Sequence, residues 1–111
     1  MKELNKLVNE ALEVQDFIEI LKSHVEKMGF KETAWSCEKS SDSIIEMEYE
    51  GNYRHVIMLS KATKRWYLYY NVYSGEKKKT NLKYTNTEVF STDKEFKEIL
   101  NNFDKEFDGR E

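Results

Sequence analysis

The chain has 111 residues, a formal net charge of −3, no proline, one cysteine and two histidines. This length predicts a single domain spanning residues 1–111, and the lone Cys37 with His24 and His55 excludes a disulfide framework and a four-ligand zinc site, so we expect no metal or other cofactor. No apolar run approaches the roughly 20 residues of a membrane span, and the first residues carry acidic groups too early for a signal peptide, so we expect a soluble cytoplasmic protein.

Residues 3–28 predict a long amphipathic helix, because apolar residues recur at alternating steps of three and four. Gly29 fits the C′ position after the helix, and Phe30 can make the hydrophobic contact of a Schellman ending. The spacing is also that of a coiled coil. Flanking apolar residues such as Phe17 widen the stripe, however, so we expect the helix to pack on a sheet of the same chain.

Four or five antiparallel strands are predicted after this helix. In the strand expected at residues 43–50, three glutamates alternate with apolar residues, which is typical of a half-buried strand. The expected strands cover residues 33–38, 43–50, 53–60, 65–74 and 80–90.

The dipeptide Gly51-Asn52 predicts a two-residue hairpin loop of type II′. Pairing across a loop of that length places Val56 and Met58 on the core face of the sheet. It also places His55 on the opposite face, across from Glu48, where the two side chains would form a cross-strand charge pair.

The strand at residues 65–74 is aromatic on both faces, so the alternation alone does not say which face is buried. An even number of residues in the preceding turn puts Tyr67 and Tyr69 on the face of Val56 and Met58, and an odd number puts the other set there. Leu68 favours burial of that other set, which is Trp66, Leu68, Tyr70 and Val72.

Residues 92–107 predict a second helix, which begins at a capping box formed by Thr92 and Glu95. The chain order is therefore helix, four or five strands, helix. Helices at both ends can share one face of the sheet, so we expect a two-layer α+β domain with an antiparallel sheet.

No motif of nucleophilic, metal-dependent or nucleotide chemistry occurs in the chain, and no two of the four glycines are close enough to form a phosphate-binding loop. Cys37 lies in an alternating apolar pattern, which predicts a buried and inert thiol. Glu46, Glu48 and His55 could form a metal patch, but exposed strand carboxylates are far more often solvated. We therefore expect a protein that is not an enzyme.

The charges are unevenly distributed along the chain. Residues 54–83 carry 8 basic side chains and 1 acidic one, a net of +7, between blocks with nets of −6 and −4. The middle block has the sign of an anion-binding surface, although folding could interleave the blocks so that their fields partly cancel.

Tyrosines and cations coincide in this middle block. Aromatic rings on a sheet with flanking cations suit single-stranded nucleic acid, and tyrosine and arginine are also typical anchors of protein interfaces. The candidate partner-binding residues are Tyr67, Tyr69, Tyr73, Arg65, Lys64, Lys77, Lys78, Lys79 and Lys83. An alternative acidic surface on the first helix consists of Glu13, Asp16, Glu19 and Glu26.

These features favour recognition over catalysis. Our first hypothesis is a non-enzymatic macromolecule-binding module, a small inhibitor or regulator that binds a protein or nucleoprotein complex. Many Lys and Asn codons with no proline indicate an AT-rich genome, which leaves room for a phage or mobile-element protein of the anti-CRISPR type. The alternatives are a single-stranded nucleic-acid-binding domain that uses the Tyr/Lys face, and a homodimeric scaffold joined through the N-terminal helix.

Overall fold

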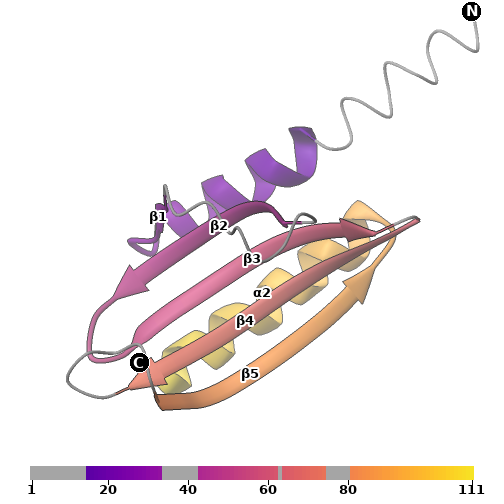
Figure 1. Cartoon of the computed structure of the whole chain (residues 1–111). Helices are drawn as coiled ribbons and strands as arrows, with labels where there is room; N and C mark the ends of the chain where they lie inside the picture. Colours follow the sequence, from indigo (N-terminus) through magenta and orange to yellow (C-terminus); the bar gives the residue numbers. More distant parts are fainter. Residues whose placement is uncertain (1–14, 34–42, 63, 75–80) are drawn as a thin grey trace, which may run out of the picture.

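The computed structural model describes residues 15–33, 43–62, 64–74 and 81–111. These ranges contain an N-terminal helix, five strands and a second helix, and the strands form one antiparallel sheet in the order β1-β2-β3-β4-β5 (Figure 1). The described part of the N-terminal helix covers residues 15–26. The other elements are β1 (Lys31–Glu32), β2 (Ser43–Glu50), β3 (Arg54–Ala62), β4 (Arg65–Ser74), β5 (Asn81–Phe90) and α2 (Asp93–Arg110). This arrangement confirms the expected α+β class.

The N-terminal helix ends in the expected Schellman motif. The Phe30 N–H donates to the Val25 carbonyl and the Gly29 N–H donates to the Glu26 carbonyl, both at 3.0 Å. Gly29 has a φ of 102°, and a Cβ at this position would lie 3.1 Å from the Tyr49 ring. The positive φ therefore favours glycine here, and a larger residue would also press on the Tyr49 ring.

The first strand differs from the expectation. β1 contains only Lys31–Glu32, and it begins directly after the Schellman turn, where Lys31 pairs with Glu48. β1 does not overlap the expected strand at residues 33–38. Thr33 is not part of a strand, and the rest of the expected strand, with Cys37, lies outside the described residues, as do residues 3–14 of the expected helix.

The hairpin of β2 and β3 differs from the expectation by one residue. Glu50 pairs with Arg54, so the loop has three residues, Gly51–Tyr53, instead of two. The pairings from Ile45 to Glu50 shift with it, and Met47 lies opposite Ile57. The placement of Val56 and Met58 on the core face was therefore wrong, because His55, Ile57 and Leu59 face the helices instead. β3 is apolar at both alternating positions, so its pattern does not fix the face.

The turn that follows decides the orientation of β4. Ala62 pairs with Arg65 across two residues, so the turn is even, and Met58 pairs with Tyr69 on one face. That face lies away from the helices because of the shifted hairpin. The expected set is therefore buried although the turn is even: Trp66, Leu68, Tyr70 and Val72.

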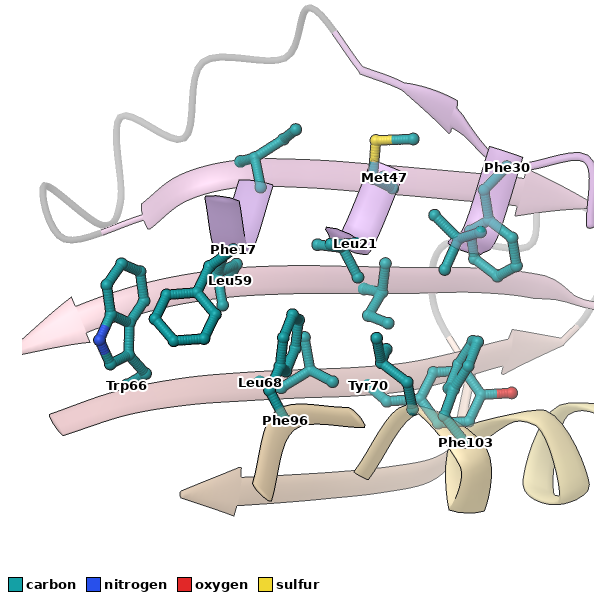
Figure 2. Close-up of a cluster of buried hydrophobic side chains, with 14 of the residues drawn as sticks. Phe17, Leu21, Phe30, Met47, Leu59, Trp66, Leu68, Tyr70, Phe96 and Phe103 are labelled. Atoms are coloured by element: carbon teal, nitrogen blue, oxygen red, sulfur yellow. The ribbon is translucent and has the colours of Figure 1, made fainter. Parts of the chain in front are cut away.

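Both helices pack on the same face of the sheet (Figures 1 and 2). Phe17 of the N-terminal helix contacts Phe96 of α2 edge-on at 5.5 Å between ring centroids, and Phe30 contacts Phe103 at 5.8 Å. Pairs of this kind contribute about 0.5–1.5 kcal/mol beyond the burial of their area. The two helices thus share one aromatic core with β4. Within the described ranges, no helix is long and apolar enough to cross a membrane.

α2 begins at the expected capping box. The Thr92 side chain accepts a hydrogen bond from the Glu95 N–H, and the Glu95 carboxylate accepts one from the Thr92 N–H. The helix continues to Arg110, three residues beyond the expected end.

The register of β3 predicts unequal effects of two neighbouring substitutions. Ile57→Ala should lower the free energy of unfolding by about 2–5 kcal/mol, because it removes a fully buried side chain. Met58→Ala, on the other face, should cost less than about 1 kcal/mol. Urea unfolding measures both values, and a larger loss for Met58→Ala would contradict the register.

Candidate binding surface

We call the sheet face opposite the two helices the outer face. The register places Tyr67, Tyr69 and Tyr73 of β4 on this face, where all three are half-buried. The Tyr67 and Tyr69 ring centroids lie 6.2 Å apart with planes 17° from parallel, and the Arg54 guanidinium lies 5.3 Å from the Tyr73 ring centroid. The three expected tyrosines are therefore brought together along one strand.

The expected cations are only partly placed by the structure. Lys64 and Arg65 are exposed at the start of β4, and Lys83 is exposed on β5 near the opposite end of the tyrosine row. Lys77, Lys78 and Lys79 lie outside the described residues. The described cations thus flank the tyrosines at both ends.

Two apolar residues on the outer face were not predicted from the sequence. Leu82 and Val89 of β5 are 50% and 45% exposed, and they pair across the strands with Tyr73 and Tyr67 respectively. Leu82 reaches this face because the register of β4 and β5 shifts between Val72 and Tyr73. No local sequence pattern indicates such a shift. Val89 could have been found from the sequence, because exposed Thr and Val residues alternate at the end of β5.

Charge is segregated across the outer face. Glu46, Glu48 and Glu50 line β2, whereas no carboxylate lies on the outer face of the described parts of β4 and β5. Arg54 forms a two-pronged ion pair with Glu48, and this hydrogen bonding raises the pKa of Arg54. Burial, and then the Glu48 charge, raises the pKa of Glu46. The two edges of the outer face therefore differ in sign.

The alternative acidic surface is partly retained. Asp16, Glu19 and Glu26 are exposed on the N-terminal helix, and Glu13 lies outside the described residues. Asp16 and Glu19 line a groove of about 700 Å³ between the two helices, together with Ile20 of the same helix. The helices are also joined by His24 and Asp104, whose Nε2 and Oδ1 atoms lie 2.6 Å apart.

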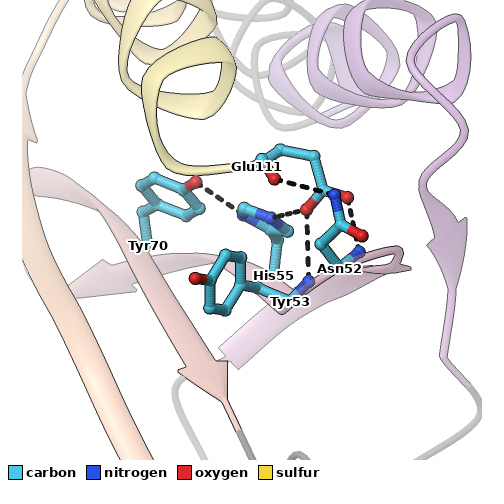
Figure 3. Close-up of polar contacts among 5 residues, drawn as sticks. All are labelled: Asn52, Tyr53, His55, Tyr70 and Glu111. Atoms are coloured by element: carbon cyan, nitrogen blue, oxygen red, sulfur yellow. Dashed lines mark hydrogen bonds and ion pairs between the residues drawn. The ribbon is translucent and has the colours of Figure 1, made fainter.

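A buried polar cluster joins the β2–β3 loop to the end of α2 (Figure 3). His55 is fully buried, and its Nδ1 lies 2.7 Å from the Tyr70 hydroxyl while its Nε2 lies 2.7 Å from Glu111 Oε2. We call these residues, together with Asn52 and Tyr53, the Glu111 cluster. The expected charge pair of His55 with Glu48 was wrong, because the three-residue loop turns His55 to the helix side of the sheet. Glu48 forms its ion pair with Arg54 instead.

The same geometry removes the metal patch considered from the sequence, because Glu46 and Glu48 lie on the outer face and His55 on the inner one. In the part of the chain that the structure describes, no group of three or more His, Cys, Asp or Glu side chains could hold a metal ion.

The hydrogen bonds of His55 define its proton positions. A carboxylate only accepts, so Nε2 donates to Glu111 and Nδ1 accepts from the Tyr70 hydroxyl. Burial lowers the pKa of His55, which keeps the ring neutral, and burial also raises the pKa of Tyr70. Both ring nitrogens are thereby occupied inside the core, so His55 has a structural role.

Glu111 also holds the backbone of the loop. Its carboxylate accepts from the Asn52 N–H at 2.6 Å and from the Tyr53 N–H at 3.3 Å. Burial alone raises the pKa of Glu111, but these hydrogen bonds and the one from His55 outweigh it and hold the pKa below its ordinary value. A Cβ on Gly51 would lie 2.0 Å from Glu111 Oε1 and 2.6 Å from the Tyr49 ring, so a larger residue here would displace the carboxylate.

Removal of the Glu111 side chain should destabilise the fold. Glu111→Ala leaves a buried His55 N–H and two loop N–H groups without their acceptor, which should cost about 1–3 kcal/mol. Asp108→Ala, which removes an exposed carboxylate from the same helix, is the matched control and should change stability by less than about 0.5 kcal/mol. Equal midpoints for the two variants in urea unfolding would show that the cluster stabilises nothing.

His55 and Glu111, the two titrating groups of the Glu111 cluster, predict that the stability of the fold decreases in acid. His55 has a lowered folded-state pKa, so below its ordinary value of 6.5 the unfolded chain binds the proton that the folded chain refuses. Stability should fall as the pH drops below 6.5, by at most about 1.4 kcal/mol per pH unit for this group. Below pH 4.5, protonation of Glu111 removes a further contribution.

Urea unfolding between pH 8 and 5, in a His24→Gln background that leaves His55 as the lone imidazole, measures this effect. Stability that is constant or increasing below pH 6.5 would contradict the burial of a neutral His55.

Comparison with known proteins identifies no relative. No protein-family model, curated protein or solved structure matches the chain. The function is therefore argued from the arrangement of the chain's own residues.

Proposed function

We propose that the protein is a non-enzymatic binding module, a small inhibitor or regulator that covers part of a protein or nucleoprotein complex with its outer face. The observation that carries the proposal is the tyrosine row of β4, flanked by the two large apolar residues that β5 exposes, Leu82 and Val89. Exposed apolar area beside tyrosine is characteristic of recognition surfaces, and it is unfavourable on a surface that meets only water.

The charges of the outer face favour a protein partner over nucleic acid. Glu46 and Glu50 lie on the same face as the tyrosines and would repel a phosphate backbone that crossed the sheet. Arg54 is already committed to Glu48 and is not available to phosphate. A protein surface can instead place a basic patch against β2 and an acidic one beside Arg65.

Composition supports a narrower form of the proposal. The AT-rich codon usage implied by abundant lysine and asparagine and by the absence of proline is typical of low-GC bacteria and their phages. A small cytoplasmic protein of this origin that acts by binding would serve as an anti-defence inhibitor of the anti-CRISPR type, with a nucleic-acid-handling complex as its target.

Photo-cross-linking locates the partner and tests the face. A photoreactive phenylalanine derivative replaces Tyr69 on the outer face or Lys97 on the exposed side of α2, in the full chain, and adducts formed in host lysate are identified by mass spectrometry. The proposal expects a protein adduct from position 69 that is absent from position 97. Tyr67→Ala should weaken the same complex by about 1–3 kcal/mol, as expected for an interface aromatic.

Nucleic-acid binding is the competing outcome. Anisotropy titrations with single-stranded and duplex oligonucleotides at low salt should stay flat. Tight binding that weakens steeply with salt, and that is lost on Lys83→Gln, would replace the proposal with a nucleic-acid-binding function.

A further inference from the structure

β5 is a long edge strand. It has ten residues and pairs only with β4 among the described strands, whereas β1 at the other edge has two residues. At the edge of a sheet, alternate backbone N–H and C=O groups point away from the neighbouring strand and are free to pair with another chain. β5 lies at the edge of the sheet (Figure 1), and it is also the most exposed of the long strands, with most of its residues open to solvent.

A cleft of about 310 Å³ lies on the helix side of this strand, between β5 and α2. Its apolar part is formed by Ile99 and Phe103 of α2 and by Leu68 of β4. Its polar rim consists of Asn86 and Glu88 of β5 and Asn102, Lys105 and Glu106 of α2. The side of α2 that faces β5 is thus separate from the side that carries Asp104, which contacts the N-terminal helix.

We propose that an extended segment of the partner protein adds to β5 as a sixth strand. Side chains of a strand alternate between the two sheet faces, so every second residue of the added segment enters the cleft beside α2 and the others extend the outer face next to Val89. Backbone pairing along β5 supplies affinity, and the cleft supplies selectivity. This inference rests on the proposed function, and it identifies β5 as the element to which an extended segment of the partner binds.

The two faces define the chemistry of the segment. The cleft is apolar at Ile99 and Phe103, which selects an aliphatic or aromatic side chain. Arg65 lies on the outer face, Lys83 is exposed where β5 departs from regular pairing, and no carboxylate lies on the outer face of the described parts of β4 and β5, which selects carboxylates. The partner segment therefore alternates apolar and acidic residues.

A second copy of the chain fits the same edge poorly. A symmetric β5–β5 pair would continue one sheet through both copies. Because the pair is antiparallel, the Lys83 end of each β5 would lie beside the Phe90 end of the other copy, close to its Arg65, so cations of the two copies would be brought together. We therefore expect the protein alone to sediment as a monomer.

Selection from a random peptide library tests the inference directly on the protein. Linear peptides of about 12 residues, long enough to pair along the whole edge strand, are displayed and selected against the full chain, and synthetic copies of the winners are titrated by fluorescence polarisation. The expected winners alternate apolar and acidic residues. On binding, they should slow hydrogen exchange at β5 amides by about tenfold or more relative to the free protein.

Two adjacent asparagines of α2 provide a matched pair of variants. Asn102 lines the cleft and Asn101 does not, and both are exposed, so neither change should disturb the core. Asn102→Trp fills the cleft and should weaken the selected peptides by about tenfold or more, whereas Asn101→Trp should change affinity by less than about twofold. Lys83→Glu should weaken them and Lys97→Glu should not.

Each remaining outcome contradicts strand addition. The strand-addition proposal is wrong if no peptide is enriched, or if Asn102→Trp leaves the affinity of the protein for the selected peptides unchanged. It is also wrong if sedimentation finds a β5-dependent dimer of the protein itself. Tyr69→Ala separates this failure from failure of the proposed function. Peptides or partners that are lost with Tyr69→Ala but bind Asn102→Trp normally leave the outer face as the binding surface and remove β5 as the site.

Discussion

The structure depends on the hydrogen bonds that Glu111 accepts from the loop between β2 and β3. They stabilise a three-residue loop, and the length of that loop sets the register of β3 by one residue. The register in turn decides which face of β3 meets the helices, and through the even turn that follows it decides the orientation of β4. A chain with a two-residue loop and the same turn would bury Tyr67 and Tyr69 and expose Trp66. One carboxylate at the end of α2 therefore helps to place the tyrosines in solvent.

The two faces of the sheet have different chemistry because of this register. The inner face joins the helices through aromatic contacts and keeps one neutral histidine, whose two nitrogens are both hydrogen-bonded. The outer face collects the tyrosine row, exposed Leu82 and Val89, carboxylates on β2 and cations beside β4 and β5. A face with aromatic, apolar and segregated charged groups is suited to a shaped partner, and a long free edge beside a cleft offers that partner backbone pairing as well.

Local signals predicted the parts of the fold that local forces determine. The Schellman ending at Gly29 and the capping box at Thr92 each rest on hydrogen bonds within a few residues, and both were predicted correctly. The buried side of β4 was also predicted, because Leu68 distinguishes its two faces. The face of β3 was not, since apolar residues occupy both of its alternating positions and the deciding contact comes from Glu111, more than fifty residues away in sequence. The cleft beside β5 depends on how α2 packs, which no single segment encodes.

Cross-strand proton contacts in the NMR spectrum of the full chain test the register most directly. In an antiparallel pair, Hα atoms of facing residues approach closely at alternate positions, so the contact pattern reports the pairing residue by residue. The three-residue loop predicts the pairs Met47 with Ile57 and Tyr49 with His55 across the hairpin, and Met58 with Tyr69 across the next one. Contacts of Met47 with Val56 and of Tyr49 with Arg54 would show a two-residue loop, and they would contradict both the buried histidine and the tyrosine-bearing outer face.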